Sequence, residues 1–171
     1  MDSTALREIQ APLKAKYRDD PGAAVVTLKA EGDLSGEGIA CRVETGRALV
    51  EAGLHPATGG SGLQACSGDM LLEALVACAG VTVKAVATAL EIELRGGAVR
   101  AEGDLDFRGT LGVDKETPVG FRDIRLVFEL DTDEPEDRLQ TLLRLTERYC
   151  VVLQTLRSAP AIEAKVTRRG G

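Results

Sequence analysis

The segment from residue 65 to residue 90, "ACSGDMLLEALVACAGVTVKAVATAL", is the most apolar run of the chain and decides its fold. We expect a helix over about residues 68–90, because Ser67 is a suitable N-cap and Asp69 lies in the first turn, where the helix dipole favours an acid. A narrow line of four residues interrupts the apolar surface: Glu73, Ala77, Gly80 and Lys84. A helix that is apolar nearly all round is buried on most sides. This helix is therefore expected at the centre of the fold or at a subunit interface.

Several other segments alternate between apolar and polar residues with period two, which is typical of antiparallel strands with one solvated face. Two of them form an expected N-terminal hairpin within about residues 23–45, and the others span about residues 98–108, 121–131 and 161–167. The expected inward residues of the last three strands are Val99, Ala101, Leu105 and Phe107; Ile124, Leu126, Phe128 and Leu130; and Ile162, Ala164 and Val166.

A second long helix is expected over about residues 134–157, since Pro135 suits a first turn and Pro160 ends the pattern. The segment at residues 46–66 is irregular and rich in glycine near its end, and loops of this length are uncommon unless they line a site. The order of strands and helices predicts an α+β fold in one domain.

Composition and charge exclude several classes of protein. The 171 residues carry a net charge of −6 without a basic stripe, so nucleic acid is not an expected partner. We find neither a signal-peptide pattern nor the roughly 18 uninterrupted apolar residues of a membrane span. The sequence therefore predicts a cytoplasmic protein that has no membrane partner.

The four cysteines, Cys41, Cys66, Cys78 and Cys150, are widely spaced and contain no CxxC pair, and His55 is the only histidine. Neither a metal site nor a secreted disulfide scaffold is indicated. Cys41 is most simply a small apolar residue of a strand. Cys66 is either a bystander or an alternative partner for Cys78.

Cys78 taken alone is typical of an inert buried thiol. However, Cys150 lies on the inward stripe of the second long helix. Two such helices packed face to face bring the two sulfurs within bonding reach if the Cβ atoms approach to about 4 Å. A pair of this kind can cycle between dithiol and disulfide.

The segments "CSGDMLLEALVACAGVTVKAVA" and "TERYCVV", which contain these two thiols, resemble the OsmC/Ohr family of osmotically inducible and organic-hydroperoxide-resistance proteins. The resemblance implies an intertwined homodimer with antiparallel sheets packed around two long core helices, and active sites at the interface. It also implies reduction of alkyl or lipid hydroperoxides in oxidative-stress defence, with Cys78 as the attacking cysteine and Cys150 as the resolving one. The implied reductant is a small dithiol such as dihydrolipoamide, and no cofactor is required.

The attacking thiol needs an activating group, because its ordinary pKa of about 8.5 leaves little thiolate at pH 7. The resemblance implies an arginine, and the candidates are Arg42 and Arg47. In the family's peroxidases a glutamate ten positions before the cysteine orients this arginine. Gly68 stands at that position here, and Asp69 is the nearest carboxylate.

Three further residues are candidate binding residues. His55 either acts as a base or anion ligand or caps a turn. Leu75 and Tyr149 flank the two cysteines on their helices and are expected to form apolar walls, which suit alkyl or lipid hydroperoxides better than hydrogen peroxide.

The sequence thus supports a thiol-dependent peroxidase as the first hypothesis. The alternative is an OsmC-like dimer without efficient peroxidase activity that senses redox state or binds a small ligand, and Gly68 favours it. A purely structural dimer with buried cysteines would follow if the two sulfurs lay too far apart to bond.

Overall fold

The computed structural model describes residues 3–33, 42–43, 52–166 and 168. Four strands form one antiparallel sheet in the order β2-β1-β5-β6, and two short strands form a separate parallel pair. The bounds of the strands are Val25–Asp33 for β1, Arg42–Val43 for β2, Ala52–Gly53 for β3, Ala65–Cys66 for β4, Gly96–Asp106 for β5 and Phe121–Asp131 for β6. The fold is α+β, as the sequence predicts.

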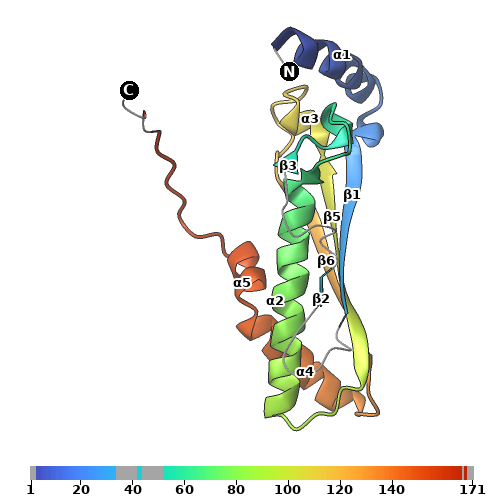
Figure 1. Cartoon of the computed structure of the whole chain (residues 1–171), viewed down its shortest axis with the longest axis vertical. Coiled ribbons are helices and arrows are strands. Elements are labelled where there is room, and N and C mark those ends of the chain that lie inside the picture. The colour runs from blue at the N-terminus through green and yellow to red at the C-terminus, as the bar shows by residue number, and fades with distance from the viewer. Residues whose placement is uncertain (1–2, 34–41, 44–51, 167, 169–171) are drawn as a thin grey trace.

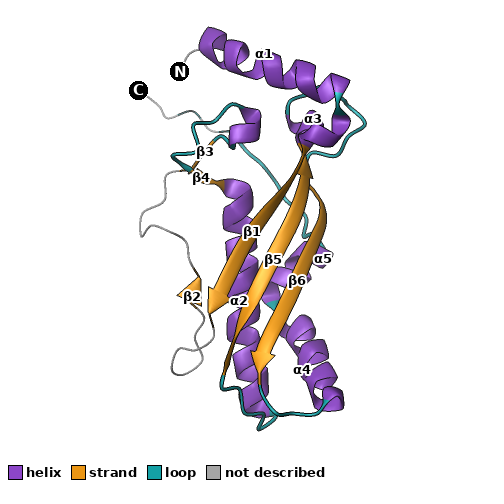
Figure 2. Cartoon of the chain, turned by 90° about the vertical axis from the view of Figure 1, so that its right-hand side faces the viewer, coloured by secondary structure: helices purple, strands orange, loops and turns teal. Residues whose placement is uncertain are grey.

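Helix α2 (Ser67–Ala89) runs along one face of the sheet, as Figures 1 and 2 show. Alternation along β5 points Val99 and Ala101 at this helix, and both are fully buried. On α2 the sheet and the neighbouring helices bury Leu72, Leu75 and other apolar residues. The helix is therefore the centre of the core.

The opposite face of α2 is not covered by the elements that the structure describes. Leu71 is 37% exposed and Val81 is 41% exposed on this face. By length and composition α2 also meets the criteria for a membrane span, which is weak evidence because core helices of soluble proteins meet them too. The expected central position is confirmed for one face of the helix, and a subunit interface at the other face stays a prediction.

The predicted single helix over residues 134–157 is in fact two helices, α4 (Glu136–Tyr149) and α5 (Val151–Arg157). Cys150 separates them, with φ −71° and ψ 106°, values that belong to extended backbone. Because of the break, Leu153 and Leu156 of α5 pack against the core around α2. The apolar spacing continues through Cys150 without interruption, so periodicity alone does not reveal the break.

A second, smaller core lies at one end of the molecule. There α1 (Ser3–Asp19) packs near η1 (Pro21–Ala24), η2 (Pro56–Thr58) and α3 (Phe107–Thr110), as Figure 1 shows. The buried Tyr17 donates a hydrogen bond of 2.7 Å from its hydroxyl to the carbonyl oxygen of Ala57. No helix at the position of α1 was expected from the sequence. The strand expected to reach residue 108 ends at Asp106, which caps α3 by accepting the N–H of Arg108.

The expected C-terminal strand over residues 161–167 is not formed in the described residues up to 166. This C-terminal arm, residues 159–166, extends away from the body in Figure 1. Ile162 is 86% exposed and Val166 is 98% exposed, so the residues predicted to point inward face solvent. A strand needs a neighbouring strand to satisfy its backbone groups, and none of the described strands of the chain lies beside this arm.

Candidate functional site

Cys78 and Cys150 meet where α2 contacts the junction of α4 and α5. Their side chains are within hydrogen-bond contact, with the Cys150 thiol next to the Cys78 sulfur. Cys150 is fully buried, whereas Cys78 is only partly buried. This geometry agrees with the prediction that the two inward stripes bring the thiols together. It disagrees with the alternative of a purely structural dimer, which required the two sulfurs to lie far apart.

The surroundings of Cys78 favour its thiolate. Burial alone would raise the pKa of Cys78, but four hydrogen bonds outweigh it and hold the pKa below its ordinary value. The donors are the backbone N–H of Val152, the thiol of Cys150, the backbone N–H of Val151 and the hydroxyl of Thr82. Among the residues that the structure describes, no charged side chain is one of these largest influences.

Cys150 has the opposite character. Its pKa is raised to about 11, first by burial; the N–H of Leu153 opposes the rise, and the hydrogen bond to Cys78 and the charge of Cys78 contribute to it. Within the pair, Cys78 is therefore the thiol that ionises first, and Cys150 stays protonated until a later step.

The break between α4 and α5 provides the backbone donors. The first N–H groups of a helix have no acceptor within that helix, so Val151 and Val152 can donate to Cys78. The single proton of the Thr82 hydroxyl, four residues after Cys78, is shared between the Cys78 sulfur and the carbonyl oxygen of Cys78, which lies 2.7 Å from the hydroxyl. The sequence analysis missed these donors; the spacing of four between Thr82 and Cys78 was the one available signal.

The side chains of the two candidate activating arginines lie outside the described part of the structure. Arg47 falls outside the described residues, as does Cys41, and only the backbone of Arg42 is described, in β2. Asp69 is not among the largest influences on Cys78. Burial raises the pKa of Asp69, and electrostatic attraction to the nearby His55 partly lowers it. Asp69 therefore interacts with His55.

His55 and Cys66 line a cavity of about 370 Å³ at the start of α2, together with Gly68 and Phe107. His55 caps η2, because its Nδ1 accepts the N–H of Ala57 at 3.0 Å, and its ring stacks on Phe107 with centroids 5.0 Å apart. His55 therefore caps a turn and also lines a cavity.

Cys66 is remote from the thiol pair. It is the N-cap of α2, and the twelve helical residues to Cys78 place the two thiols roughly 18 Å apart at 1.5 Å per residue. A disulfide between them would require a rearrangement of the helix. Cys66 is therefore a bystander to the chemistry of Cys78.

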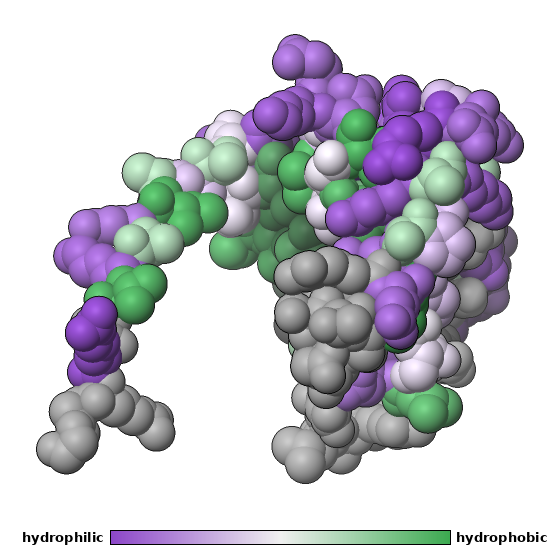
Figure 3. Space-filling model, turned by 90° about the horizontal axis from the view of Figure 1, so that it is seen from above, coloured by the Kyte–Doolittle hydropathy of each residue, from purple (hydrophilic) through white to green (hydrophobic). Residues whose placement is uncertain are grey.

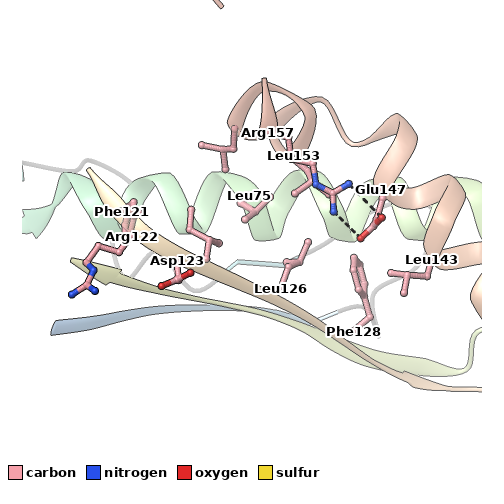
Figure 4. A pocket seen from close by; sticks show the side chains of 12 residues that line it. Leu75, Phe121, Arg122, Asp123, Leu126, Phe128, Leu143, Glu147, Leu153 and Arg157 are labelled. Atoms are coloured by element: carbon pink, nitrogen blue, oxygen red, sulfur yellow. Dashed lines mark hydrogen bonds and ion pairs between the residues drawn. The ribbon is translucent and has the colours of Figure 1, made fainter. Parts of the chain in front are cut away.

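An apolar groove of about 480 Å³ opens between the sheet and the helices on the side of β6 (Figure 4). Leu75 of α2, Leu126 and Phe128 of β6 and Leu153 of α5 project into it, as Figure 4 shows. Glu147 and Arg157 form an ion pair of 2.9 Å at its edge. The space continues into a second groove of about 440 Å³ that is lined further along β6 and α4.

The two expected apolar wall residues, Leu75 and Tyr149, lie in different surroundings. Leu75 lines the groove as a wall residue. Tyr149 is 57% exposed and lies against the guanidinium of Arg148, outside the linings of the three cavities described above. Among the described residues, the histidine, cysteine and acidic side chains form no group of three that would hold a metal ion.

Comparisons with known proteins agree with this architecture. A family model described as OsmC-like protein matches residues 60–165, which is more than half of the chain. No curated protein matches.

Two solved structures are similar in fold. One is an OsmC-like hydroperoxide resistance protein from Jannaschia sp. CCS1, with 16% identity and a TM-score of 0.61 over 85% of this chain and 95% of that one. The other is an OsmC-like protein from Mycoplasma pneumoniae, with 16% identity and a TM-score of 0.55 over 79% of this chain and 86% of that one. With the match over residues 60–165, these findings show that the chain belongs to the OsmC-like protein family.

Proposed function

We propose that the protein is a thiol-dependent peroxidase that reduces organic hydroperoxides. The Cys78 thiolate attacks the terminal oxygen of the hydroperoxide, the O–O bond breaks, and the alkoxide leaves as the alcohol after taking a proton. Cys78 becomes a sulfenic acid. Cys150 then attacks its sulfur, which forms the disulfide and releases water. A small dithiol of the dihydrolipoamide type returns the pair to the reduced state by exchange.

The asymmetry of the thiol pair carries this proposal. A two-cysteine peroxidase needs one thiol that is ionised early and accessible, and a second that waits beside it. Cys78 has a lowered pKa and partial exposure, whereas Cys150 is fully buried and has a pKa raised to about 11. Hydrogen-bond contact between the two side chains supports disulfide formation without large movement.

The surface beside Cys78 supports an apolar substrate. Leu71 and Val81 lie on the same exposed side of α2, and Val151 at the start of α5 is 70% exposed. Apolar side chains of this kind favour an alkyl or lipid chain over hydrogen peroxide, because they gain from removing apolar surface from water.

The same features support a homodimer as part of the proposal. The uncovered face of α2 is an apolar surface in a chain that otherwise has a packed core. The C-terminal arm alternates apolar and charged residues without a partner, and β6 is an edge strand next to the apolar groove. We propose that the arm of a second copy pairs with β6 and places Ile162 and Val166 over that groove.

Gly68 favours a second candidate function. In the family's peroxidases a glutamate occupies this position, and here Gly68 lines the cavity that contains His55 and Cys66. The alternative is a dimer that binds a small ligand or senses redox state through the same thiol pair without efficient turnover.

The first test is stopped-flow consumption of cumene hydroperoxide with dihydrolipoamide as reductant. Wild-type protein should consume the peroxide and form the Cys78–Cys150 disulfide, and Cys78→Ser should lose the reaction. Cys150→Ser should react once with peroxide and accumulate a sulfenic acid that dimedone traps. Cys66→Ser is the matched control and should behave as wild type.

Two results would count against the proposal. If Cys78→Ser consumes the peroxide as fast as wild type, Cys78 is not the attacking residue. If wild type forms the disulfide readily with a general thiol oxidant but reacts slowly with every organic hydroperoxide tried, the redox-sensing or ligand-binding alternative stands instead.

A further inference from the structure

Thr146 carries a buried hydroxyl that has no hydrogen-bond partner among the described residues. The residue is 1% exposed and lies on α4, one turn before Cys150. Its backbone carbonyl accepts the N–H of Cys150 at 2.9 Å, so the backbone of this turn is satisfied while the side chain is not. Buried polar groups in proteins nearly always have a partner, and an exception calls for an explanation.

Other threonines on the helices show the hydrogen bond that a helical hydroxyl usually makes. Thr82, Thr88 and Thr155 each donate to the carbonyl oxygen four residues earlier, at 2.7, 2.9 and 2.8 Å. Thr146 is also helical but makes no such bond. Its hydroxyl proton is therefore available to another acceptor.

The resolving thiol belongs to the residue four positions after Thr146, whose N–H bonds to the Thr146 carbonyl oxygen. Residues four apart on a helix are neighbours on one face, and a helical side chain leans back over the preceding turn. Cys150 is the C-cap of α4 and keeps a helical φ of −71°, so its side chain starts from the same face as Thr146. Both residues are buried, and in the reduced pair the Thr146 hydroxyl makes no hydrogen bond to the Cys150 sulfur.

We propose that Thr146 is a positioning residue for the second step, in which its hydroxyl donates a hydrogen bond to the Cys150 sulfur as that thiol loses its proton. The inference rests on the proposed function. In this step the Cys150 sulfur attacks the sulfur of the Cys78 sulfenic acid, the S–S bond forms and the S–O bond breaks. Hydroxide leaves and takes up the proton lost by Cys150, so the products are the disulfide and one water.

The need for such a donor follows from the surroundings of Cys150. Burial raises the pKa of this thiol to about 11, so the developing thiolate lacks stabilisation in the reduced pair. After Cys78 is oxidised, it no longer carries the negative charge that opposes ionisation of Cys150. The Thr146 hydroxyl can then stabilise the thiolate without introducing a permanent charge into the core.

Rapid-quench mass spectrometry of the reaction with cumene hydroperoxide tests this proposal. It separates loss of the Cys78 thiol from appearance of the disulfide. Thr146→Val keeps the shape but removes the hydroxyl, and we expect disulfide formation to slow about tenfold relative to the preceding oxidation step, since a hydrogen bond to a charged group is lost. Thr146→Ser keeps the hydroxyl and should restore the rate.

A matched control and a second oxidant make the result specific. Thr155→Val makes the same substitution on an exposed face of α5 and should leave disulfide formation unchanged. Diamide oxidises Cys78 to a sulfenylhydrazide, and attack by Cys150 then releases the hydrazine and forms the same disulfide. This reaction tests Thr146 even if hydroperoxides do not oxidise Cys78, so failure of the proposed function is distinguishable.

The proposal is overturned if Thr146→Val forms the disulfide within twofold of the wild-type rate with diamide. It is also overturned if Thr146→Val and Thr146→Ser slow the step equally, because packing rather than the hydroxyl would then be responsible. Circular dichroism establishes that each variant retains the fold.

Discussion

Neutral donors lower the pKa of Cys78 in the described part of the chain. Backbone N–H groups of Val151 and Val152 act together with two side-chain donors, and they outweigh the effect of burial on the pKa of Cys78. Hydrogen bonds to the charged form favour ionisation just as a nearby cation does. The break at Cys150 leaves these two N–H groups without helical acceptors, so they can donate to the thiol.

Replacing Val151 by proline tests this directly. Val151 is the first residue of α5, where proline is well tolerated, and the extended backbone of Cys150 suits a residue that precedes proline. Val151→Pro removes one donor, so the pKa of Cys78 should rise and its alkylation by iodoacetamide at pH 7 should slow several-fold. Because the thiolate is the reactive form, the rate rises with pH, and the midpoint of this rise should move to higher pH.

Val151→Ala is the control, because it shortens the same side chain and keeps the N–H. The two variants should differ in the pH dependence of alkylation. Identical pH profiles for both would mean that the Val151 N–H does not stabilise the thiolate.

At the level of elements, a buried carboxylate joins β5 to α3. Alternation along the strand placed Asp106 on the solvated side, but it is 1% exposed. Asp106 accepts the N–H of Arg108 at 3.1 Å, pairs with the Arg108 guanidinium at 2.7 Å and lies 3.7 Å from Arg122. These partners make burial of the carboxylate possible, since a buried charge must be paired and hydrogen-bonded.

Asp106→Asn should destabilise the fold and flatten its dependence on pH. The hydrogen bonds from Arg108 hold the pKa of Asp106 below its ordinary value. The stability from this group is therefore present above the unfolded pKa of about 4 and is lost as the pH falls through the lower folded pKa. We expect urea titrations at pH 7 to show a loss of about 2 kcal/mol, with a smaller decline in acid than wild type shows.

Asp123→Asn on β6 is the matched control, because this carboxylate is exposed. It should change the free energy of unfolding by less than about 0.5 kcal/mol. An Asp106→Asn protein as stable as this control at pH 7 would show that the ion pairs around Asp106 contribute no net stability.

On the scale of the whole molecule, the C-terminal arm pairs with no strand in the described part of the chain. Seen from above in Figure 3, it stands away from the body across a hollow whose wall carries hydrophobic side chains. Ile162 and Val166 alternate with Glu163 and Lys165, and the latter two pair with each other at 3.0 Å. A strand with one apolar side fits an edge strand that has an apolar groove beside it.

Charged residues on the apolar side of the arm should weaken the proposed dimer. Each aliphatic side chain contributes about 1.5–3 kcal/mol when fully buried, so Ile162→Asp with Val166→Asp should raise the dissociation constant at least about a hundredfold. Sedimentation velocity over a range of concentrations measures this change. Glu163→Ala with Lys165→Ala alters the other side of the arm and should leave association nearly unchanged.

Equal sedimentation of the two double variants and wild type would show that the arm does not hold a second copy. The exposed face of α2 would then remain as the candidate interface, and Val81→Asp would test it in the same assay.

Local patterns in the sequence determine much of this protein. Period-two alternation places β5 and β6 within a few residues of their observed bounds, and the apolar run of residues 65–90 predicts α2. The inward stripes on the two helical segments also predict the meeting of Cys78 and Cys150. The strands and α2 depend on side-chain spacing along one element, which the sequence contains in full, whereas the meeting of the thiols also needs the two stripes to pack together.

Features that depend on packing between helices and strands are decided by the tertiary structure alone. The break at Cys150 interrupts neither apolar spacing nor helix propensity, so only the packing of α5 against α2 reveals it. The burial of Asp106 depends on arginines of other elements, and the arm stays unpaired because a strand forms only beside another strand. The sequence therefore determined which two thiols react together in our proposal. The fold decided which of them ionises first, because burial and hydrogen bonds across elements set the two pKa values apart.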